Sequence, residues 1–183
     1  QNQKYTEGVY VYDKSTDQFV INSLISAGSM LKPLVKEGKL FIPSPYYNPG
    51  GLIISDYKNT PLSFSDDKTI LINSKNGLAA SGTVSAAIDK NDDVWIGTRL
   101  GLRILPNASN AINNTDNKAE PIVITQNGIP EELFKDLVIL QVEVDSGNQK
   151  WVSVEGGGVF YLSSNGENTI SHFTKVNSPL PND

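Results

Sequence analysis

Residues 94–102 read VWIGTRLGL, a short apolar run with glycines that directly follows a polar turn. A looser copy begins at Trp151, again after a polar turn, at 146–150. The two tryptophans, Trp95 and Trp151, are 56 positions apart, and so are the aspartates that precede the two turns, Asp89 and Asp145. Self-similarity at about this period is typical of proteins built from repeated structural units. The sequence therefore predicts a repeat fold.

Each unit contains short β-branched or apolar runs separated by turns rich in Asp, Asn and Gly, which is the pattern of antiparallel strands. Four such strands form one blade of a β-propeller. A weaker unit lies upstream, where Phe41 stands 54 positions before Trp95. We therefore predict an all-β fold of four-stranded antiparallel propeller blades, in which Phe41, Trp95 and Trp151 fill the space between neighbouring blades.

The repeats predict an incomplete propeller of about three to four blades. Residues 106–120 are polar and rich in Asn, and they predict a loop between the third and fourth strands of a blade, either disordered or in contact with a partner. Because a closed ring needs at least about four blades, we expect a fragment whose open blade edges pair with a neighbouring copy. The predicted limits are a partial blade at 1–23, blades at 24–75, 80–126 and 136–176, and a lead-in to the next blade at 177–183.

Composition narrows the classes of partner. The 183 residues carry 20 acidic and 15 basic side chains, and the resulting net charge of −5 would repel a phosphate backbone, so nucleic acid is not an expected partner. The absence of cysteine excludes disulfides, thiolate zinc sites and cysteine nucleophiles. The sequence also lacks an apolar run of about 18 residues that could span a membrane.

The sequence contains no evident catalytic constellation. His172 is the only histidine, so a multi-histidine metal site is excluded, and no nucleophile motif accompanies it. Asp89, Asn91 and Asp93 match the first ligand positions of a calcium-binding loop. Val94 stands where such a loop needs glycine, however, and a hairpin turn is favoured instead. We expect no catalytic residue, no metal and no cofactor.

Four residues are candidates for ligand binding. Arg99 and Glu155 occupy equivalent positions just after the tryptophan-bearing strand, where the loops of a propeller contact partners. Tyr46 and Tyr47 lie in a proline-flanked irregular segment, where their rings can either stack on a sugar or pack on the neighbouring blade.

The tryptophan-bearing stretch resembles a known repeat. Residues 95–102 are similar to the two-component regulator propeller repeat of Bacteroidetes, whose pattern is close to D-x-x-G-x-x-W-I-G-T-x-x-G-L. Residues 151–162 resemble the same pattern, with departures at Ser153 and Val154. One branch, the PorZ-type surface proteins of the type IX secretion system, is also similar at three further segments, 56–73, 122–134 and 167–181. The resemblance covers residues 38–183.

This resemblance implies a non-enzymatic binding or scaffold module of an exported protein, located in the periplasm or on the outer cell surface. The PorZ-type branch implies two propellers, a C-terminal β-sandwich and a role in delivering anionic lipopolysaccharide to the machinery that anchors secreted cargo. The implied partners are therefore a protein, a polysaccharide or lipopolysaccharide. The sister branch implies the periplasmic ligand-sensing propeller of a hybrid two-component histidine kinase. A third class, a propeller lyase or glycosidase fragment, would need convergent carboxylates or a histidine pair at one rim.

Overall fold

Short strands joined by tight turns make up the fold, as the frequent Gly, Asn and Asp residues predict. The computed structural model describes residues 8–22, 24–25, 29–46, 50–126 and 128–183. In these residues every strand pairing is antiparallel, and the strands form two four-stranded sheets, one three-stranded sheet and two hairpins. The fold is all-β and its sheets are propeller blades, as the sequence predicts.

The N-terminal part of the chain forms a hairpin and the first sheet. The hairpin consists of β1 (Val9–Asp13) and β2 (Gln18–Asn22). The first sheet consists of β3 (Leu34–Lys36), β4 (Lys39–Ser44), β5 (Gly51–Asp56) and β6 (Lys68–Ile72), paired in chain order. Every residue of β5 is buried, so this sheet is covered on both faces.

The middle sheet has three strands where four are expected. It consists of β7 (Thr83–Ile88), β8 (Val94–Thr98) and β9 (Gly101–Leu105), with the short 3-10 helices η1 (Ser74–Asn76) before it and η2 (Ala108–Asn110) after it. At the place of a fourth strand, Glu120 forms one bridge to Ile104, with a backbone hydrogen bond of 2.8 Å in each direction. The next residue, Pro121, has no N–H, so the ladder stops there.

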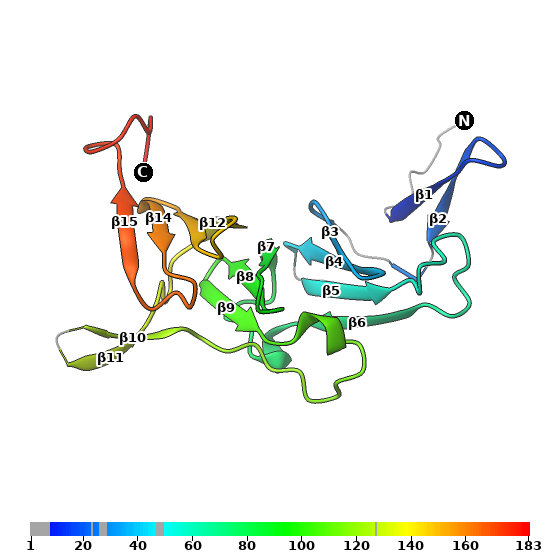
Figure 1. The fold of residues 1–183 in the computed structure, drawn as a ribbon, viewed down its shortest axis with the longest axis horizontal. Helices are drawn as coiled ribbons and strands as arrows, with labels where there is room; N and C mark the ends of the chain where they lie inside the picture. Colours follow the sequence, from blue (N-terminus) through cyan, green and yellow to red (C-terminus); the bar gives the residue numbers. More distant parts are fainter. Residues whose placement is uncertain (1–7, 23, 26–28, 47–49, 127) are drawn as a thin grey trace.

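The C-terminal part forms a projecting hairpin and the last sheet. The hairpin consists of β10 (Val123–Gln126) and β11 (Ile129–Glu132), and it extends outward from the other sheets (Figure 1). The last sheet consists of β12 (Ile139–Val144), β13 (Lys150–Val154), β14 (Gly158–Leu162) and β15 (Thr169–Phe173). The sheets follow one another in an arc, with β1 and β2 at one tip and β15 at the other (Figure 1).

Apolar side chains between successive sheets hold the arc together. The first strands β3, β7 and β12 lie toward its concave side, and β7 contacts β4 while β12 contacts β7 and β8. One buried cluster joins Phe41 of the first sheet to Ile96 of the middle sheet. A second cluster joins Trp95 of the middle sheet to Val142 and Val152 of the last sheet. Each sheet therefore obtains its hydrophobic core by packing on its neighbours. The apolar surface buried between the sheets stabilises the fold by roughly 25 cal/mol per Å².

The polar segment 106–120 is ordered and partly packed against the sheets, while many of its polar residues stay exposed. Ala111 and Ile112 are buried in the cluster between the first and middle sheets. Ser109 Oγ donates a hydrogen bond of 3.0 Å to the carboxylate of Glu37, in the turn between β3 and β4. Of the two expected states, disorder does not apply, because a few small apolar residues spread among the asparagines fill the gap beside β9. Contact of the exposed residues with a partner stays a prediction.

Two of the three predicted inter-blade aromatic positions are filled as expected. Phe41 and Trp95 are 0% and 1% exposed. Trp151 differs, because 37% of its surface is exposed and no sheet in the described part of the chain covers the face on which it lies.

A buried lysine joins the middle and last sheets. Lys150 is the first residue of β13 and is fully buried, although its sequence context indicates a turn residue. Its Nζ lies 2.8 Å from Asp89 Oδ2 and 4.6 Å from the centroid of the Trp95 ring. The same Nζ donates to the carbonyl oxygens of Asn148 and Ser164, at 2.7 and 2.5 Å. The ammonium group thus has the acceptors that a buried charge requires. We call Lys150, Asp89 and Trp95 the Lys150 cluster.

Replacing the lysine tests how strongly this cluster stabilises the fold. Lys150→Met is expected to lower the free energy of unfolding by about 3 kcal/mol or more, because the carboxylate of Asp89 then stays buried without its counter-charge. Urea denaturation followed by circular dichroism measures the loss. Lys118→Met is the control, since the side chain of Lys118 is 68% exposed and its ion pair with Asp116 is long, at 3.6 Å. Equal losses for the two variants would contradict the role given to Lys150.

The same cluster predicts a dependence of stability on pH. Burial raises the pKa of Asp89, but hydrogen bonds from Lys150, the Asp93 backbone and Trp95 outweigh burial and hold this pKa below its ordinary value. Such a carboxylate stabilises the folded state above the unfolded pKa of about 3.9, and the contribution is lost as pH falls through the folded pKa. The stability advantage of the chain over an Asp89→Asn variant should therefore shrink below about pH 4. Urea midpoints at a series of pH values check this, and a constant difference would refute it.

Candidate functional site

In three successive sheets the second strand ends on the same face of the arc. Tyr46 follows β4, Arg99 follows β8 and Glu155 follows β13. Because the strands have the same order and direction in each sheet, these three residues lie at equivalent ends of the sheets. We call this surface the turn face.

The backbone of the turn face is tied to the segment that leads into the last sheet. The amide of Asp136 donates to the carbonyl oxygen of Leu100 at 3.2 Å, and the amide of Glu155 donates to the carbonyl oxygen of Val138 at 3.0 Å. These bonds hold the Arg99 and Glu155 turns to a common connecting segment. The turns are thereby fixed relative to each other while their side chains face solvent.

The candidate side chains that the structure describes on this face lie at the surface. Arg99 and Glu155 are exposed, and among the described residues neither side chain makes a hydrogen bond or an ion pair. Tyr46 is 61% exposed. Tyr47, the fourth candidate, lies outside the described residues. The structure therefore places three of the candidates on one face, but no described hydrogen bond or ion pair joins them into a compact site.

Sequence reasoning missed a groove on the concave side of the arc. It has a volume of about 280 Å³ and lies between the first strands of the sheets, with apolar walls from residues such as Leu34 and Val84 and polar groups from Lys32 and Gln141. The alternation of apolar and polar residues along 140–144 could have indicated Gln141, because alternate residues of a strand share a face. The groove itself could not be found, since it depends on how the sheets are placed relative to one another.

A second hollow, of about 320 Å³, contains the side chains of Asp93, Glu120 and Glu167. Burial raises the pKa of Asp93 above its ordinary value, in spite of a hydrogen bond of 3.4 Å from the Asn107 amide. No hydrogen bond links the three carboxylates among the described residues. Within the same residues, no three His, Asp or Glu side chains are arranged to hold a metal ion.

The single histidine has structural contacts. The ring of His172 stacks on Phe160 with centroids 3.9 Å apart, and its Nε2 lies 2.6 Å from the carbonyl oxygen of Gly157. The Asp89 turn is likewise a hairpin turn, with Asp89 Oδ1 accepting from the amides of Asn91 and Asp93 at 2.8 and 3.0 Å. In the part of the chain that the structure describes, no helix is long and apolar enough to cross a membrane.

Neither a protein-family model nor a curated protein sequence matches the chain. Solved structures do match its fold. PorZ of Porphyromonas gingivalis, described as an essential bacterial surface component of the type IX secretion system, is similar over 93% of this chain and 25% of its own, with a TM-score of 0.79 and 22% identity. An extracellular domain described as belonging to a hybrid two-component system of B. thetaiotaomicron matches 91% of this chain and 20% of its own, with a TM-score of 0.64 and 16% identity.

A second such extracellular domain from B. thetaiotaomicron matches 97% of this chain and 20% of its own, with a TM-score of 0.55 and 18% identity. At these identities the likeness shows a shared fold. The chain spans about a quarter or less of the length of these three structures.

The exposure of the turn face predicts that its side chains do not stabilise the fold. Arg99→Ala and Glu155→Ala should each change the free energy of unfolding by no more than about 0.5 kcal/mol. Arg103→Ala is the matched control, because Arg103 pairs with Glu132 and donates to the carbonyl oxygens of Gly77 and Leu102 at 3.2 and 2.8 Å. Its loss should be about 1–3 kcal/mol. Urea denaturation compares the three variants, and a loss for Arg99→Ala equal to that of Arg103→Ala would show a structural role for Arg99.

Proposed function

We propose that this chain is part of a non-enzymatic β-propeller in an exported bacterial protein, and that the propeller binds a partner. We further propose that the exported protein is of the PorZ type, a surface component of a type IX secretion system. The observation that carries the proposal is the fit of nearly the whole chain to PorZ, with a TM-score of 0.79 against 0.64 and 0.55 for the two extracellular domains. The resemblance of three segments outside the bare repeat to the PorZ-type branch supports the same assignment.

The turn face is the surface that we assign to the partner. Arg99 offers a charged donor for phosphate or carboxylate groups, and such hydrogen bonds are stronger than neutral ones. Tyr46 offers a ring on which a sugar can stack. Together they suit an anionic glycolipid such as lipopolysaccharide, whose phosphate and sugar groups lie close together.

The extracellular domains of two-component systems favour a second candidate function. They match 91% and 97% of the chain, so a ligand-sensing propeller has the same fold. The two functions differ in the rest of the parent protein, because a sensor would carry a membrane span and a histidine kinase, whereas a PorZ-type protein would carry a second propeller and a β-sandwich. They also differ in ligand, since a sensor would bind a soluble oligosaccharide.

Binding to vesicles tests the proposal. The chain is expected to bind phosphatidylcholine vesicles that contain anionic lipopolysaccharide, and not vesicles without it, as measured by cosedimentation. Arg99→Ala should weaken this binding by about tenfold, because a hydrogen bond to a charged group contributes about 1.5 kcal/mol or more. Lys118→Ala removes a cation in segment 106–120, at the other end of β9 from Arg99, and should leave binding unchanged.

Three results would count against parts of this proposal. An equal effect of Arg99→Ala and Lys118→Ala would show that the turn face is not used. Absence of binding to lipopolysaccharide vesicles would remove the proposed partner. Binding to soluble oligosaccharides in a glycan screen, without binding to the vesicles, would favour the sensing function instead.

A further inference from the structure

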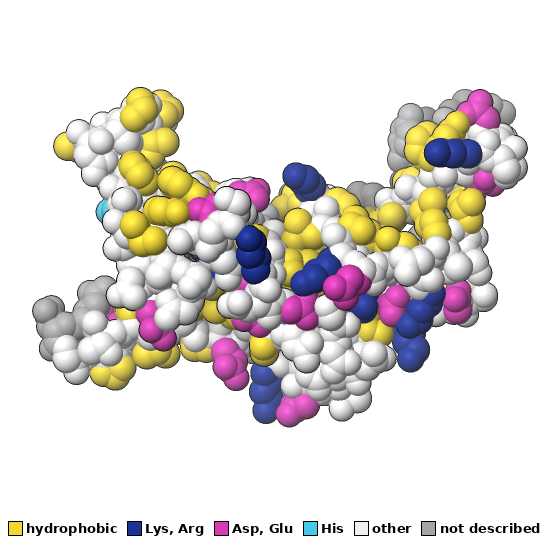
Figure 2. All heavy atoms as spheres, in the orientation of Figure 1, with side chains coloured by type: hydrophobic (Ala, Val, Ile, Leu, Met, Phe, Trp, Pro, Cys, Tyr) yellow, Lys and Arg dark blue, Asp and Glu magenta, His cyan; other side chains and the backbone are white. Residues whose placement is uncertain are grey.

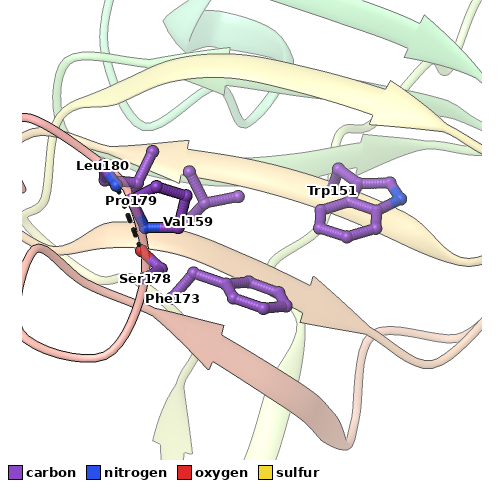
Figure 3. Close-up of a pocket in the computed structure, with 6 residues that line it drawn as sticks. All are labelled: Trp151, Val159, Phe173, Ser178, Pro179 and Leu180. Atoms are coloured by element: carbon purple, nitrogen blue, oxygen red, sulfur yellow. Dashed lines mark hydrogen bonds between the residues drawn. The ribbon is translucent and has the colours of Figure 1, made fainter.

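The free face of the last sheet carries aromatic side chains that no other sheet covers within the described residues. The rings of Trp151 and Tyr161 are stacked with centroids 4.4 Å apart, and the rings of Trp151 and Phe173 are 5.7 Å apart. We call these three residues and Val159 the Trp151 face. Figure 2 shows hydrophobic side chains gathered at this end of the arc, and Figure 3 shows Trp151 and Phe173 side by side on the sheet.

Part of this face is hollowed into an apolar pocket of about 280 Å³. The C-terminal segment closes one end of the pocket, where the amide of Leu180 donates to Ser178 Oγ at 3.4 Å (Figure 3). Continuous exposed apolar surface of this kind marks an interaction site in a soluble protein. The residues that line the pocket are Trp151, Val159, Phe173, Ser178, Pro179 and Leu180.

The chain itself contains a covered version of this face. Trp95 holds the equivalent position on the middle sheet and is 1% exposed, because the last sheet packs on it. The covering side chains include Val142 and Val152. Ser85 Oγ accepts a hydrogen bond of 2.8 Å from the Val142 amide, which adds a polar contact between the two sheets. The kind of surface that fits a tryptophan at this position is therefore another β-sheet.

The aspartates beside the two tryptophans make this comparison more specific. Asp89 Oδ1 accepts two backbone amides of its turn, and Asp145 Oδ1 accepts those of Gly147 and Gln149 at 2.8 and 2.9 Å. Their second oxygens differ. Asp89 Oδ2 meets Lys150 from the covering sheet, whereas Asp145 Oδ2 accepts only from Tyr161 of its own sheet, at 2.8 Å, among the described groups. Among the described residues, Asp145 therefore has no lysine in the position that Lys150 takes beside Asp89.

The type of residue at the start of the second strand of a covering sheet differs with the turn that it contacts. The turn between β3 and β4 has Glu37 in place of an aspartate, and this carboxylate is exposed and accepts from Ser109 Oγ. The middle sheet, which covers the first sheet, begins β8 with Val94. The turn between β7 and β8 begins at Asp89, and the last sheet, which covers it, begins β13 with Lys150. In this chain the buried aspartate is thus paired with a lysine of the covering sheet, whereas the exposed glutamate has an apolar residue at the corresponding position.

A second carboxylate near Trp151 also favours a positive charge in any sheet that covers this face. Glu143 lies directly opposite Trp151 in the register of β12 and β13, and it is exposed. The equivalent position on the middle sheet is Ala87, which is 6% exposed under the last sheet. A sheet that covers Trp151 would therefore bring Glu143 as well as Asp145 out of water, which is costly unless a positive charge accompanies them.

We propose that the Trp151 face is the docking surface for a further propeller blade whose second strand begins with a lysine. The ammonium group of this lysine binds the Asp145 carboxylate and lies over the Trp151 ring, as Lys150 does at Asp89 and Trp95. Apolar residues of the same blade cover Phe173 and Val159. This inference concerns a surface other than the turn face and does not depend on the partner proposed for it.

A tandem chain tests the proposal. Residues 139–183 are added directly after Asp183, so that residues 174–183 link β15 to the added first strand as residues 73–82 link β6 to β7. The added unit keeps its own lysine, and its tryptophan is replaced by phenylalanine. Docking should shift the fluorescence emission of Trp151 to shorter wavelength and reduce its quenching by acrylamide to that of a buried tryptophan. The 183-residue chain gives the value for the uncovered face.

Two variants of the tandem chain separate the lysine from general apolar contact. In the first, the lysine of the added unit is replaced by valine, the residue at the equivalent position 94. In the second, the lysine is kept and Asp145→Asn is introduced. Each should lower the equilibrium constant for docking by at least about tenfold, because each removes one partner of a charge pair that docking buries. In the 183-residue chain, Asp145→Asn should have a much smaller effect on stability, and circular dichroism confirms that each chain is folded.

Three outcomes would overturn the proposal. Trp151 could remain as accessible to acrylamide in the tandem chain as in the 183-residue chain. The valine unit could dock as well as the lysine unit. Finally, the 183-residue chain could already shield Trp151 by forming a dimer, as sedimentation would show, in which case a second copy occupies the face.

Discussion

The buried charge of Lys150 is the constraint on which the arrangement of the middle and last sheets depends. An ammonium group without solvent contact is tolerated only where acceptors surround it, and here the carboxylate of Asp89 and two carbonyl oxygens do so. Because Asp89 belongs to one sheet and Lys150 to the next, both charges are paired when the sheets meet in the observed position, and any other position would leave them buried without partners. Apolar packing around Trp95 favours contact in general, and the ion pair selects this particular contact.

The periodicity of the sequence predicts much of this fold, but not the contacts between sheets. Strands, turns and the spacing of Phe41 and Trp95 follow from local patterns of apolar and polar residues. Lys150 could not be predicted as buried, because lysine is among the residues least often found inside proteins and it stands beside a polar turn. The missing fourth strand of the middle sheet has a local signal in Pro121, whereas the packing of segment 106–120 depends on sheets distant in the sequence.

The sequence also predicts part of the candidate site, the turn face. Arg99 and Glu155 are recognised as equivalent turn residues from the repeat alone, and the structure places Tyr46 on the same face. The concave groove could not be foreseen, since it is formed by three sheets together. The surfaces between the sheets and the turn face have different roles. Side chains that point between the sheets pack the sheets together, whereas Arg99 and Glu155 are exposed at turns, where a change of side chain costs the fold little.

The central claim is that a buried ion pair fixes the middle sheet against the last sheet. A double-mutant cycle with Asp89→Asn, Lys150→Met and the combined variant measures this directly, from the free energies of unfolding in urea. The account predicts a coupling free energy of about 2 kcal/mol or more, because the combined variant leaves no unpaired buried charge and should lose much less stability than the sum of the single variants. Losses that add within about 0.5 kcal/mol would contradict it.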